Sequence, residues 1–286
     1  MIERISILGT GLLGTSVGLA LRSAGFRGAI TGWNRGAEQG QTALKMGAVD
    51  SLAADGVEAA RTSEVTVLAV PIFATLDWME KLAPALGPDQ LITDVGSTKR
   101  VISETAVRLF NSSNRAAFLP GHPMAGKERG GAALGDANLF RGAVWLFTDD
   151  PAARRSAKAA ELVMSWREMV AALGAKTLDL DAVRHDELVA WVSHLPQFTA
   201  TALSALLEEE VGDAPELKDV GGRALREMTR LGASPYSMWR DIAHTNTEAV
   251  ERALLALEQR LAHLRENLRT PELRNEFEQA NKFRRE

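Results

Sequence analysis

The segment RISILGTGLLGTS, at residues 4–16, decides the fold. It begins as a short run of β-branched and apolar residues and ends in three spaced glycines, just before an alanine- and leucine-rich stretch. This order predicts a strand, a glycine turn and a helix, the context in which G-x-G-x-x-G binds a dinucleotide. Gly9 would allow the tight turn, Gly11 the approach of a pyrophosphate, and Gly14 close packing of the helix on the strand. The alternative is a glycine turn in an unrelated α/β protein.

Strand-like and helix-like segments alternate through the rest of the first half of the chain. Strands are expected at residues 29–33, 65–70, 91–95, 117–119, 144–147 and 176–180, and helices at 37–46, 77–86, 97–109 and 152–173. Such alternation is typical of an α/β fold with a doubly wound parallel sheet of the Rossmann type.

The pattern changes at Asp181, after which no strand signal remains. Asp181 can cap a long helix, which Pro196 should kink or break. We therefore expect a dinucleotide-binding Rossmann domain at residues 1–180 and an α-helical substrate and dimerisation domain at residues 181–286.

An apolar seam runs along the last long helix. Its members recur in steps of four and three: Val250, Leu254, Leu257, Leu261, Leu264 and Leu268. This spacing favours packing against partner helices, either in the core of one subunit or across a homodimer interface. Both readings remain open, and a homodimer through the helical domain is expected.

Composition narrows the partners. The 286 residues carry a net charge of −4 and no cysteine, which excludes disulfides and thiolate chemistry. The charge argues against nucleic acid or an anionic membrane as the main partner, and no stretch is apolar enough to span a bilayer. No histidine or carboxylate cluster has metal-ligand spacing. We expect a cytoplasmic protein that takes a small-molecule substrate and no metal.

The end of the second strand bears on the choice of dinucleotide. An NAD site usually has an acidic residue there, but this chain has Asn34 and Arg35. Asn34 can bond a hydroxyl or a phosphate oxygen, and Arg35 can pair with a 2′-phosphate, so NADP is expected over NAD. The alternative is that Arg35 points to solvent and both cofactors bind. The other expected cofactor-binding residues are Gly9, Gly11, Leu12, Leu13, Gly14, Val70, Pro71 and Ser97.

Two glycine-containing loops follow predicted strands, where an open α/β sheet binds its ligands. They are DVGSTK at residues 94–99 and GHPMAGKE at residues 121–128. His122 lies between a glycine and a proline, on a shaped loop, and imidazole is the side chain best suited to take a proton near neutral pH.

The remaining histidines and one arginine are weaker candidates. His185, His244 and His263 have polar neighbours in helical segments and are expected on the surface. His194 lies at a helix break, and it could equally be a core or interface histidine. Arg230 lies between two helices, where it can bind a carboxylate bidentately or cap a helix.

Together these motifs resemble the prephenate/arogenate dehydrogenase family, the tyrosine-biosynthesis dehydrogenases. The matching pieces occur in family order: GTGLLGTS at 9–16, DVGSTK at 94–99, GHPMAG at 121–126, SHLP at 193–196, and TR at 229–230 followed by MWRD at 238–241. The resemblance implies a Rossmann domain followed by an α-helical dimerisation domain, with the active site in the cleft between them.

The resemblance also implies a reaction, the oxidative decarboxylation of a cyclohexadienol with hydride transfer to a nicotinamide. His122 would accept the proton of the ring hydroxyl, Ser97 would orient it, and Arg230 would hold the ring carboxylate. His194 and Gln197 would lie near the substrate side chain, and Lys99 would contribute to substrate binding.

Two positions depart from the family pattern. Asn34 and Arg35 replace the usual acid, and Gln197 stands where many prephenate-using members carry a second histidine. A neutral amide can meet either a pyruvyl or an amino-acid side chain, and we favour an enzyme that accepts arogenate, with or without prephenate.

Other functional classes stay open. A β-hydroxyacid-dehydrogenase-like NADP-dependent reductase would rely on a lysine of the helical domain, where Lys218 is the main one. A non-catalytic NADP-binding sensor would need neither the His122–Ser97 pair nor Arg230.

Overall fold

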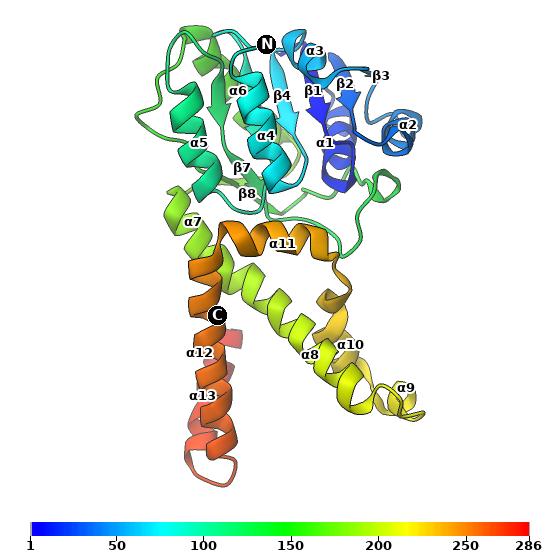
Figure 1. Ribbon diagram of the computed structural model, residues 1–286, viewed down its shortest axis with the longest axis vertical. Coiled ribbons are helices and arrows are strands. Elements are labelled where there is room, and N and C mark those ends of the chain that lie inside the picture. Colours follow the sequence, from blue (N-terminus) through cyan, green and yellow to red (C-terminus); the bar gives the residue numbers. More distant parts are fainter. Residues whose placement is uncertain (1, 286) are drawn as a thin grey trace. The chain divides into compact units, whose positions relative to one another are not determined.

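The computed structural model describes residues 2–285, with nothing described for the side chain of Lys218. The chain forms two compact units (Figure 1). The first comprises Met1–Leu188 and Ala233–Thr245, and the second Val189–Gly232 and Asn246–Glu286. The boundary expected after residue 180 stays a prediction.

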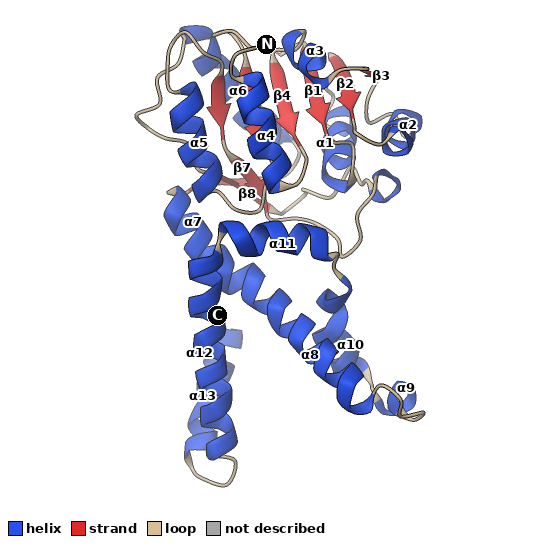
Figure 2. Cartoon of the chain, in the orientation of Figure 1, coloured by secondary structure: helices blue, strands red, loops and turns tan. Residues whose placement is uncertain are grey.

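A six-stranded, all-parallel sheet forms the centre of the first unit (Figure 2). Its strands in spatial order are β3 (Ser51–Leu52), β2 (Ala29–Trp33), β1 (Arg4–Leu8), β4 (Val65–Leu68), β5 (Leu91–Asp94) and β6 (Ala117–Leu119). The predicted doubly wound parallel sheet is confirmed. The strand order reverses between β1 and β4, so the carboxyl ends of these two strands form the switch point at which such sheets bind ligands.

Helices flank this sheet. They are α1 (Leu12–Ser23), α2 (Ala37–Lys45), α3 (Gly56–Arg61), α4 (Ile72–Leu82), α5 (Arg100–Phe110) and α6 (Ala157–Ala172). Three starts differ from the prediction. The helix expected from residue 152 begins at Ala157, because Oγ of Ser156 caps it by accepting from the N–H of Ala159. The fourth helix begins directly after Pro71, whose fixed φ suits a helix entry, and α5 begins only at Arg100 because residues 95–99 form a loop tied to two carboxylates.

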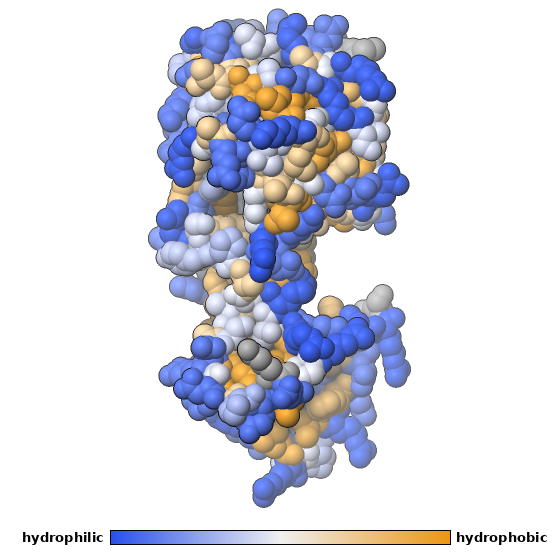
Figure 3. Space-filling view, turned by 90° about the vertical axis from the view of Figure 1, so that its right-hand side faces the viewer, coloured by the Kyte–Doolittle hydropathy of each residue, from blue (hydrophilic) through white to orange (hydrophobic). Residues whose placement is uncertain are grey.

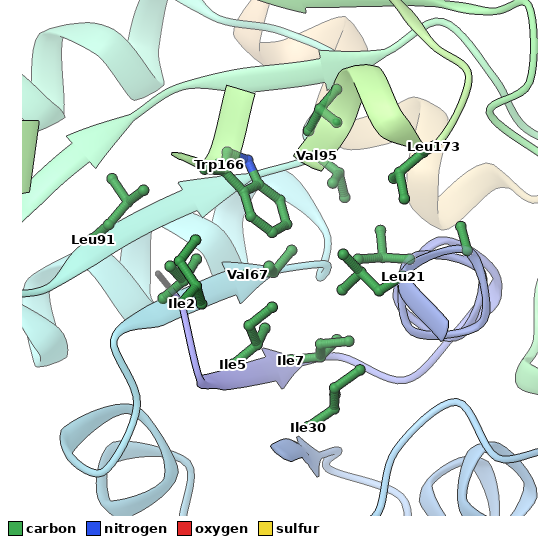
Figure 4. Packing of buried hydrophobic residues seen from close by; sticks show 14 of the residues in the cluster. Ile2, Ile5, Ile7, Leu21, Ile30, Val67, Leu91, Val95, Trp166 and Leu173 are labelled. Atoms are coloured by element: carbon green, nitrogen blue, oxygen red, sulfur yellow. The ribbon is translucent and has the colours of Figure 1, made fainter. Parts of the chain in front are cut away.

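The sheet is buried on both faces, because successive side chains of a strand point to opposite sides. Ile5 and Ile7 belong to a core that includes Val67 and Trp166 (Figure 4). Leu8 points the other way and belongs to a second core with residues of α3, α4 and α5. This two-sided burial explains why the strands are almost continuously apolar.

A second, three-stranded sheet consists of β7 (Gly121–Pro123), β8 (Val144–Phe147) and β9 (Lys176–Asp179). β7 runs antiparallel to β8, and His122 pairs with Leu146. The expectation that His122 lies on a loop is therefore wrong. Three residues are too few to show a strand period, and the pairing with β8 is a tertiary effect. Ala132–Leu134 forms a single 3₁₀ turn between β7 and β8.

The helical half begins as predicted. Asp181 caps α7 (Ala182–Val189), since its Oδ1 accepts hydrogen bonds from the N–H groups of Val183 and Arg184 at 2.9 and 3.1 Å. In the part of residues 181–285 that the structure describes, no strand occurs.

Pro196 does not stop the helix, but the turn before it departs from the α-helical pattern. Ala190–His194 adopts one π-helical turn and α8 (Leu195–Val211) continues beyond it. Proline lacks an N–H and its ring clashes with a carbonyl one turn earlier, so a wider turn before it accommodates the ring.

The remaining helices complete the chain. They are α9 (Leu217–Val220), α10 (Arg223–Thr229), a 3₁₀ turn (Arg230–Ala233), α11 (Tyr236–Thr245), α12 (Thr247–Glu266) and α13 (Glu272–Arg285). α11 belongs to the first unit. Among the described residues, no helix has the length and apolarity needed to cross a bilayer.

The predicted seam on the last long helix is only partly covered. Val250 is buried, whereas Leu254, Leu261 and Leu268 are exposed. Figure 3 shows apolar side chains on the surface of this unit among charged ones. The start of the seam is thus core, Leu257 and Leu264 are half-buried, and the other three leucines are exposed.

Candidate active site

The glycine turn has the backbone that its spacing predicts. Gly9 has a φ of +101°, and a Cβ there would lie 2.3 Å from the carbonyl oxygen of Ala69. A Cβ on Gly14 would lie 1.9 Å from the carbonyl oxygen of Gly9, whereas at Gly11 it would meet nothing within 4 Å. The turn is therefore tight on the protein side and open on the side of Gly11, which fits the approach of a pyrophosphate.

Asn34 joins the end of β2 to this turn. Its Oδ1 accepts a hydrogen bond from the N–H of Thr10 at 3.1 Å, and its Nδ2 donates to the carbonyl oxygen of Gly36 at 2.9 Å. The neighbouring Arg35 is exposed. Val70 and Pro71 follow β4, and Pro71 is exposed. These residues thus gather at the switch point, and their contacts with a cofactor stay predictions.

Asp94, at the end of β5, organises the two predicted loops. Its Oδ2 accepts from the N–H of Gly96 at 2.8 Å, and its Oδ1 accepts from the N–H of Gly121 at 3.1 Å. One buried carboxylate therefore fixes the backbone beside Ser97 and the backbone beside His122.

Lys99 forms a fully buried ion pair with Asp94. Burial lowers the pKa of the Lys99 ammonium, and the neighbouring Asp94 opposes this by favouring the charged form. The pair satisfies both charges inside the protein. A direct part for Lys99 in substrate binding stays a prediction, and Ser97, on the same loop, is half-buried.

His122 is the best-placed acid–base residue of the first unit. It is 7% exposed, and its Nδ1 lies 2.9 Å from Nε2 of His185. Nδ1 of His185 in turn lies 2.8 Å from Oδ1 of Asp186. The three side chains form a chain of hydrogen bonds that starts in β7 and ends in α7.

The expectation that His185 lies on the surface is wrong, since its side chain is fully buried. Its polar sequence neighbours suggested exposure, but its partner His122 is 63 positions away in the chain. One signal was available in the sequence, because the apolar Val189 lies four residues after His185 and so shares its helix face. In the structure Val189 is buried. Sequence analysis also missed Asp186. His244 and His263 are exposed as predicted.

Asp186 holds the start of α5 as well as His185. Its Oδ1 accepts from the N–H of Lys99 at 2.7 Å, and its Oδ2 accepts from the N–H of Arg100 at 3.0 Å. A carboxylate at a helix N-terminus is stabilised in its charged form by the helix dipole. Burial lowers the pKa of His185, so this imidazole is neutral at neutral pH.

The helical unit carries the other candidate residues. His194 is buried, with Nδ1 3.4 Å from Nδ2 of Asn246. Gln197 is also buried, and its Nε2 donates to the carbonyl oxygen of Leu231 at 2.7 Å. This bond places Gln197 beside the exposed Arg230. Convergence of this group with His122 and Ser97 stays a prediction.

The described residues contain no cluster of histidine, aspartate and glutamate that would hold a metal ion. The parallel sheet, the glycine turn at its switch point and the buried histidine chain define a dinucleotide-binding protein of the Rossmann class with a candidate acid–base site. The family profile described as "Prephenate dehydrogenase, nucleotide-binding domain" matches residues 17–178, and "Prephenate dehydrogenase, dimerization domain" matches residues 181–283. The chain belongs to the prephenate dehydrogenase family.

Curated relatives agree with this assignment. The chain is 33% identical over 247 residues to a prephenate dehydrogenase of Lactococcus lactis subsp. cremoris, and 30% identical over 251 residues to one of Bacillus subtilis. These alignments cover 86% and 87% of this chain and 66% of each relative. The chain thus spans just under two thirds of the length of these relatives.

Solved structures are similar over nearly the whole chain. The arogenate dehydrogenase of Synechocystis has a TM-score of 0.76 at 29% identity, with 98% of both chains covered. The prephenate dehydrogenase of A. aeolicus, in complex with hydroxyphenyl propionate and NAD+, has a TM-score of 0.83 at 26% identity, covering 100% of this chain and 96% of that one.

Proposed function

We propose that this protein catalyses the oxidative decarboxylation of prephenate or arogenate with hydride transfer to a nicotinamide dinucleotide, in tyrosine biosynthesis. The observation that carries the proposal is His122, a buried imidazole whose Nδ1 is engaged by His185, in a chain that matches both domains of the family. With Nδ1 occupied, Nε2 is the ring nitrogen that takes a proton from substrate.

The chain's residues divide the work between proton transfer and binding. His122 accepts the proton of the ring hydroxyl, which is within the reach of a positioned general base. Ser97 hydrogen-bonds His122 or that hydroxyl and orients it. Arg230 holds the ring carboxylate until it leaves as carbon dioxide, because a guanidinium matches a carboxylate bidentately. His194, Gln197 and Lys99 complete the substrate site.

The glycine turn fits a bound dinucleotide. Gly11 leaves the turn open where a phosphate would approach, and the first N–H groups of α1 would bind it. The nicotinamide, when bound, supplies the hydride acceptor. We further propose NADP over NAD, because Arg35 is exposed beside the turn and no acid stands at the end of β2.

We also propose arogenate as a substrate, with or without prephenate, because Gln197 stands where many prephenate-using members of the family carry a second histidine. A neutral amide can donate to a carboxylate or accept from an ammonium, so Gln197 by itself does not separate the two substrates.

We also propose a homodimer through the helical unit. The exposed seam on α12 supports it, together with the match to a dimerization domain. A cytoplasmic location stays a prediction.

The decisive test is a steady-state assay of prephenate and arogenate, each with NAD and NADP, followed by the absorbance of reduced nicotinamide. Activity in any combination supports the reaction, and the best combination decides substrate and cofactor. No activity in any of the four combinations, from a folded protein that binds NADP, would favour the NADP-dependent reductase or the non-catalytic NADP-binding sensor.

A further inference from the structure

The buried side chains around His122 form a linear series that the reaction as proposed does not use. His185 and Asp186 contact no substrate in the roles given above, yet both are almost completely buried. Burying an imidazole and a carboxylate is costly unless each is hydrogen-bonded, and here each is. The question is what this pair does for His122.

The direction of the hydrogen bonds can be worked out from the end of the series. Asp186 accepts two backbone N–H bonds at the start of α5, and a carboxylate in its charged form only accepts. The bond at 2.8 Å must then be donated by Nδ1–H of His185. Because His185 is neutral, its Nε2 carries a lone pair and accepts from Nδ1–H of His122 at 2.9 Å.

We propose that His185 and Asp186 are positioning residues that fix the tautomer of His122 and stabilise its protonated form. This inference rests on the proposed function, in which Nε2 of His122 is the base. With the Nδ1–H tautomer enforced, the lone pair of His122 is on Nε2 at all times. When the substrate O–H bond breaks, the new N–H bond forms at Nε2, and the proton on Nδ1 stays where it is.

The same arrangement stabilises the imidazolium that results. A neutral His185 accepts from the charged ring of His122, and the carboxylate of Asp186 strengthens that acceptor from behind. The logic is that of the serine-protease triad, in which a buried aspartate orients a histidine and stabilises its cation without taking the proton. Here a second imidazole stands between the aspartate and the base.

Other charges face His185 from two further elements. Lys99, before α5, lowers the pKa of His185, whereas Asp94, at the end of β5, raises it, and Asp186 on α7 raises it as well. Lys99 and Asp94 are paired with each other and act on the pKa of His185 in opposite directions. Burial has the largest effect on the pKa of His185 and keeps its imidazole neutral, so that Nε2 can accept the hydrogen bond from His122.

Two variants of His185 separate orientation from simple packing. His185→Gln keeps an amide oxygen near the position of Nε2 and so keeps an acceptor for His122. His185→Leu fills similar space with no acceptor. In both variants Asp186 keeps its hydrogen bonds to the backbone at the start of α5, and in both it loses the hydrogen bond from residue 185. His263→Gln, at an exposed position of the helical unit, is the matched control.

The first readout is the imidazole ¹⁵N spectrum of the full-length protein, which has only five histidines. His122 should be the Nδ1–H tautomer in wild type and in His185→Gln, and a mixture of tautomers in His185→Leu. The pKa of His122 should fall in His185→Leu, because its cation loses an acceptor. Unchanged tautomer and pKa in His185→Leu would overturn the proposal.

The second readout is kinetic. Loss of the hydrogen-bond partner behind a metal-bound imidazole costs about 10- to 100-fold in activity, and we expect a loss of that order in kcat of His185→Leu at nearly unchanged KM. His185→Gln should recover most of it at equal thermal stability. Equal loss in both variants, in step with their stability, would mean packing alone and would also overturn the proposal. If wild type is inactive with every substrate, the proposed function fails, while the ¹⁵N spectra still decide whether His185 fixes the tautomer of His122.

Discussion

The two units use their apolar and polar residues in opposite ways. The first buries its apolar side chains on both faces of a sheet and encloses hydrogen-bonded polar groups that extend from Asp94 to the strand that carries His122. The helical unit leaves Leu254, Leu261 and Leu268 exposed. The first unit therefore satisfies its buried polar groups internally, whereas the homodimer proposed above would cover the exposed leucines of the second.

The largest expected effect is at the base. His122→Asn removes the imidazole from the first unit and should lower kcat by about 10²- to 10⁴-fold, the worth of a positioned general base. Cofactor affinity, measured by fluorescence titration, should be unchanged because the glycine turn is untouched. Turnover close to wild type would place the proton chemistry elsewhere.

The next effect concerns the frame itself. Asp94→Asn leaves the buried ammonium of Lys99 without its charged partner, which should lower the free energy of unfolding of the first unit by about 3–5 kcal/mol. Glu80→Gln is the matched control, since it breaks an exposed ion pair with Arg108 and should cost under about 1 kcal/mol. Denaturant unfolding compares the two. Equal small losses would show that Asp94 is not the organising carboxylate.

The frame was largely predictable from the sequence, and its polar interior was not. β6 begins and ends where its apolar run does, because a strand buried on both faces leaves a local signature. β2 also has its predicted bounds, although only Ile30 and Gly32 of its five residues are buried. The hydrogen bond between His122 and His185 leaves no local signature in the sequence, because the two residues lie 63 positions apart and meet only in the tertiary structure. The same holds for β7, which exists only through β8. The candidate base was found from its flanking glycine and proline, and the residues that orient it were not.

In the helical unit, Arg230→Ala tests whether the exposed guanidinium of Arg230 binds the substrate. A hydrogen bond to a charged group contributes about 1.5–3 kcal/mol, so KM for substrate should rise about 10- to 100-fold with a smaller change in kcat. Arg226→Ala, on the preceding helix, is the control. An unchanged KM with reduced thermal stability would favour the helix-capping reading of Arg230.

The exposed seam gives a prediction about assembly. Leu261→Glu places a charge on the apolar face of α12 and should weaken the dimer about tenfold or more, measured by sedimentation equilibrium. Glu258→Gln, on the same helix, should leave the dissociation constant unchanged. A wild-type monomer, or a dimer insensitive to Leu261→Glu, would mean that another surface covers the helical unit or that none does.

The smallest effect is expected at Arg35, which directly follows Asn34 near the end of β2 in the first unit. Arg35 is exposed, so its attraction to a 2′-phosphate is screened by water and is worth about 0.2–1 kcal/mol. Arg35→Ala should therefore raise KM for NADP only about two- to fivefold and leave KM for NAD unchanged. Added salt should reduce the difference in KM for NADP between wild type and variant. Arg27→Ala is a control for a general loss of positive charge. If Arg35→Ala raises both constants equally, the arginine does not read the phosphate, and the bonds from Asn34 to Thr10 and Gly36 become the feature at this strand end that any cofactor preference must use.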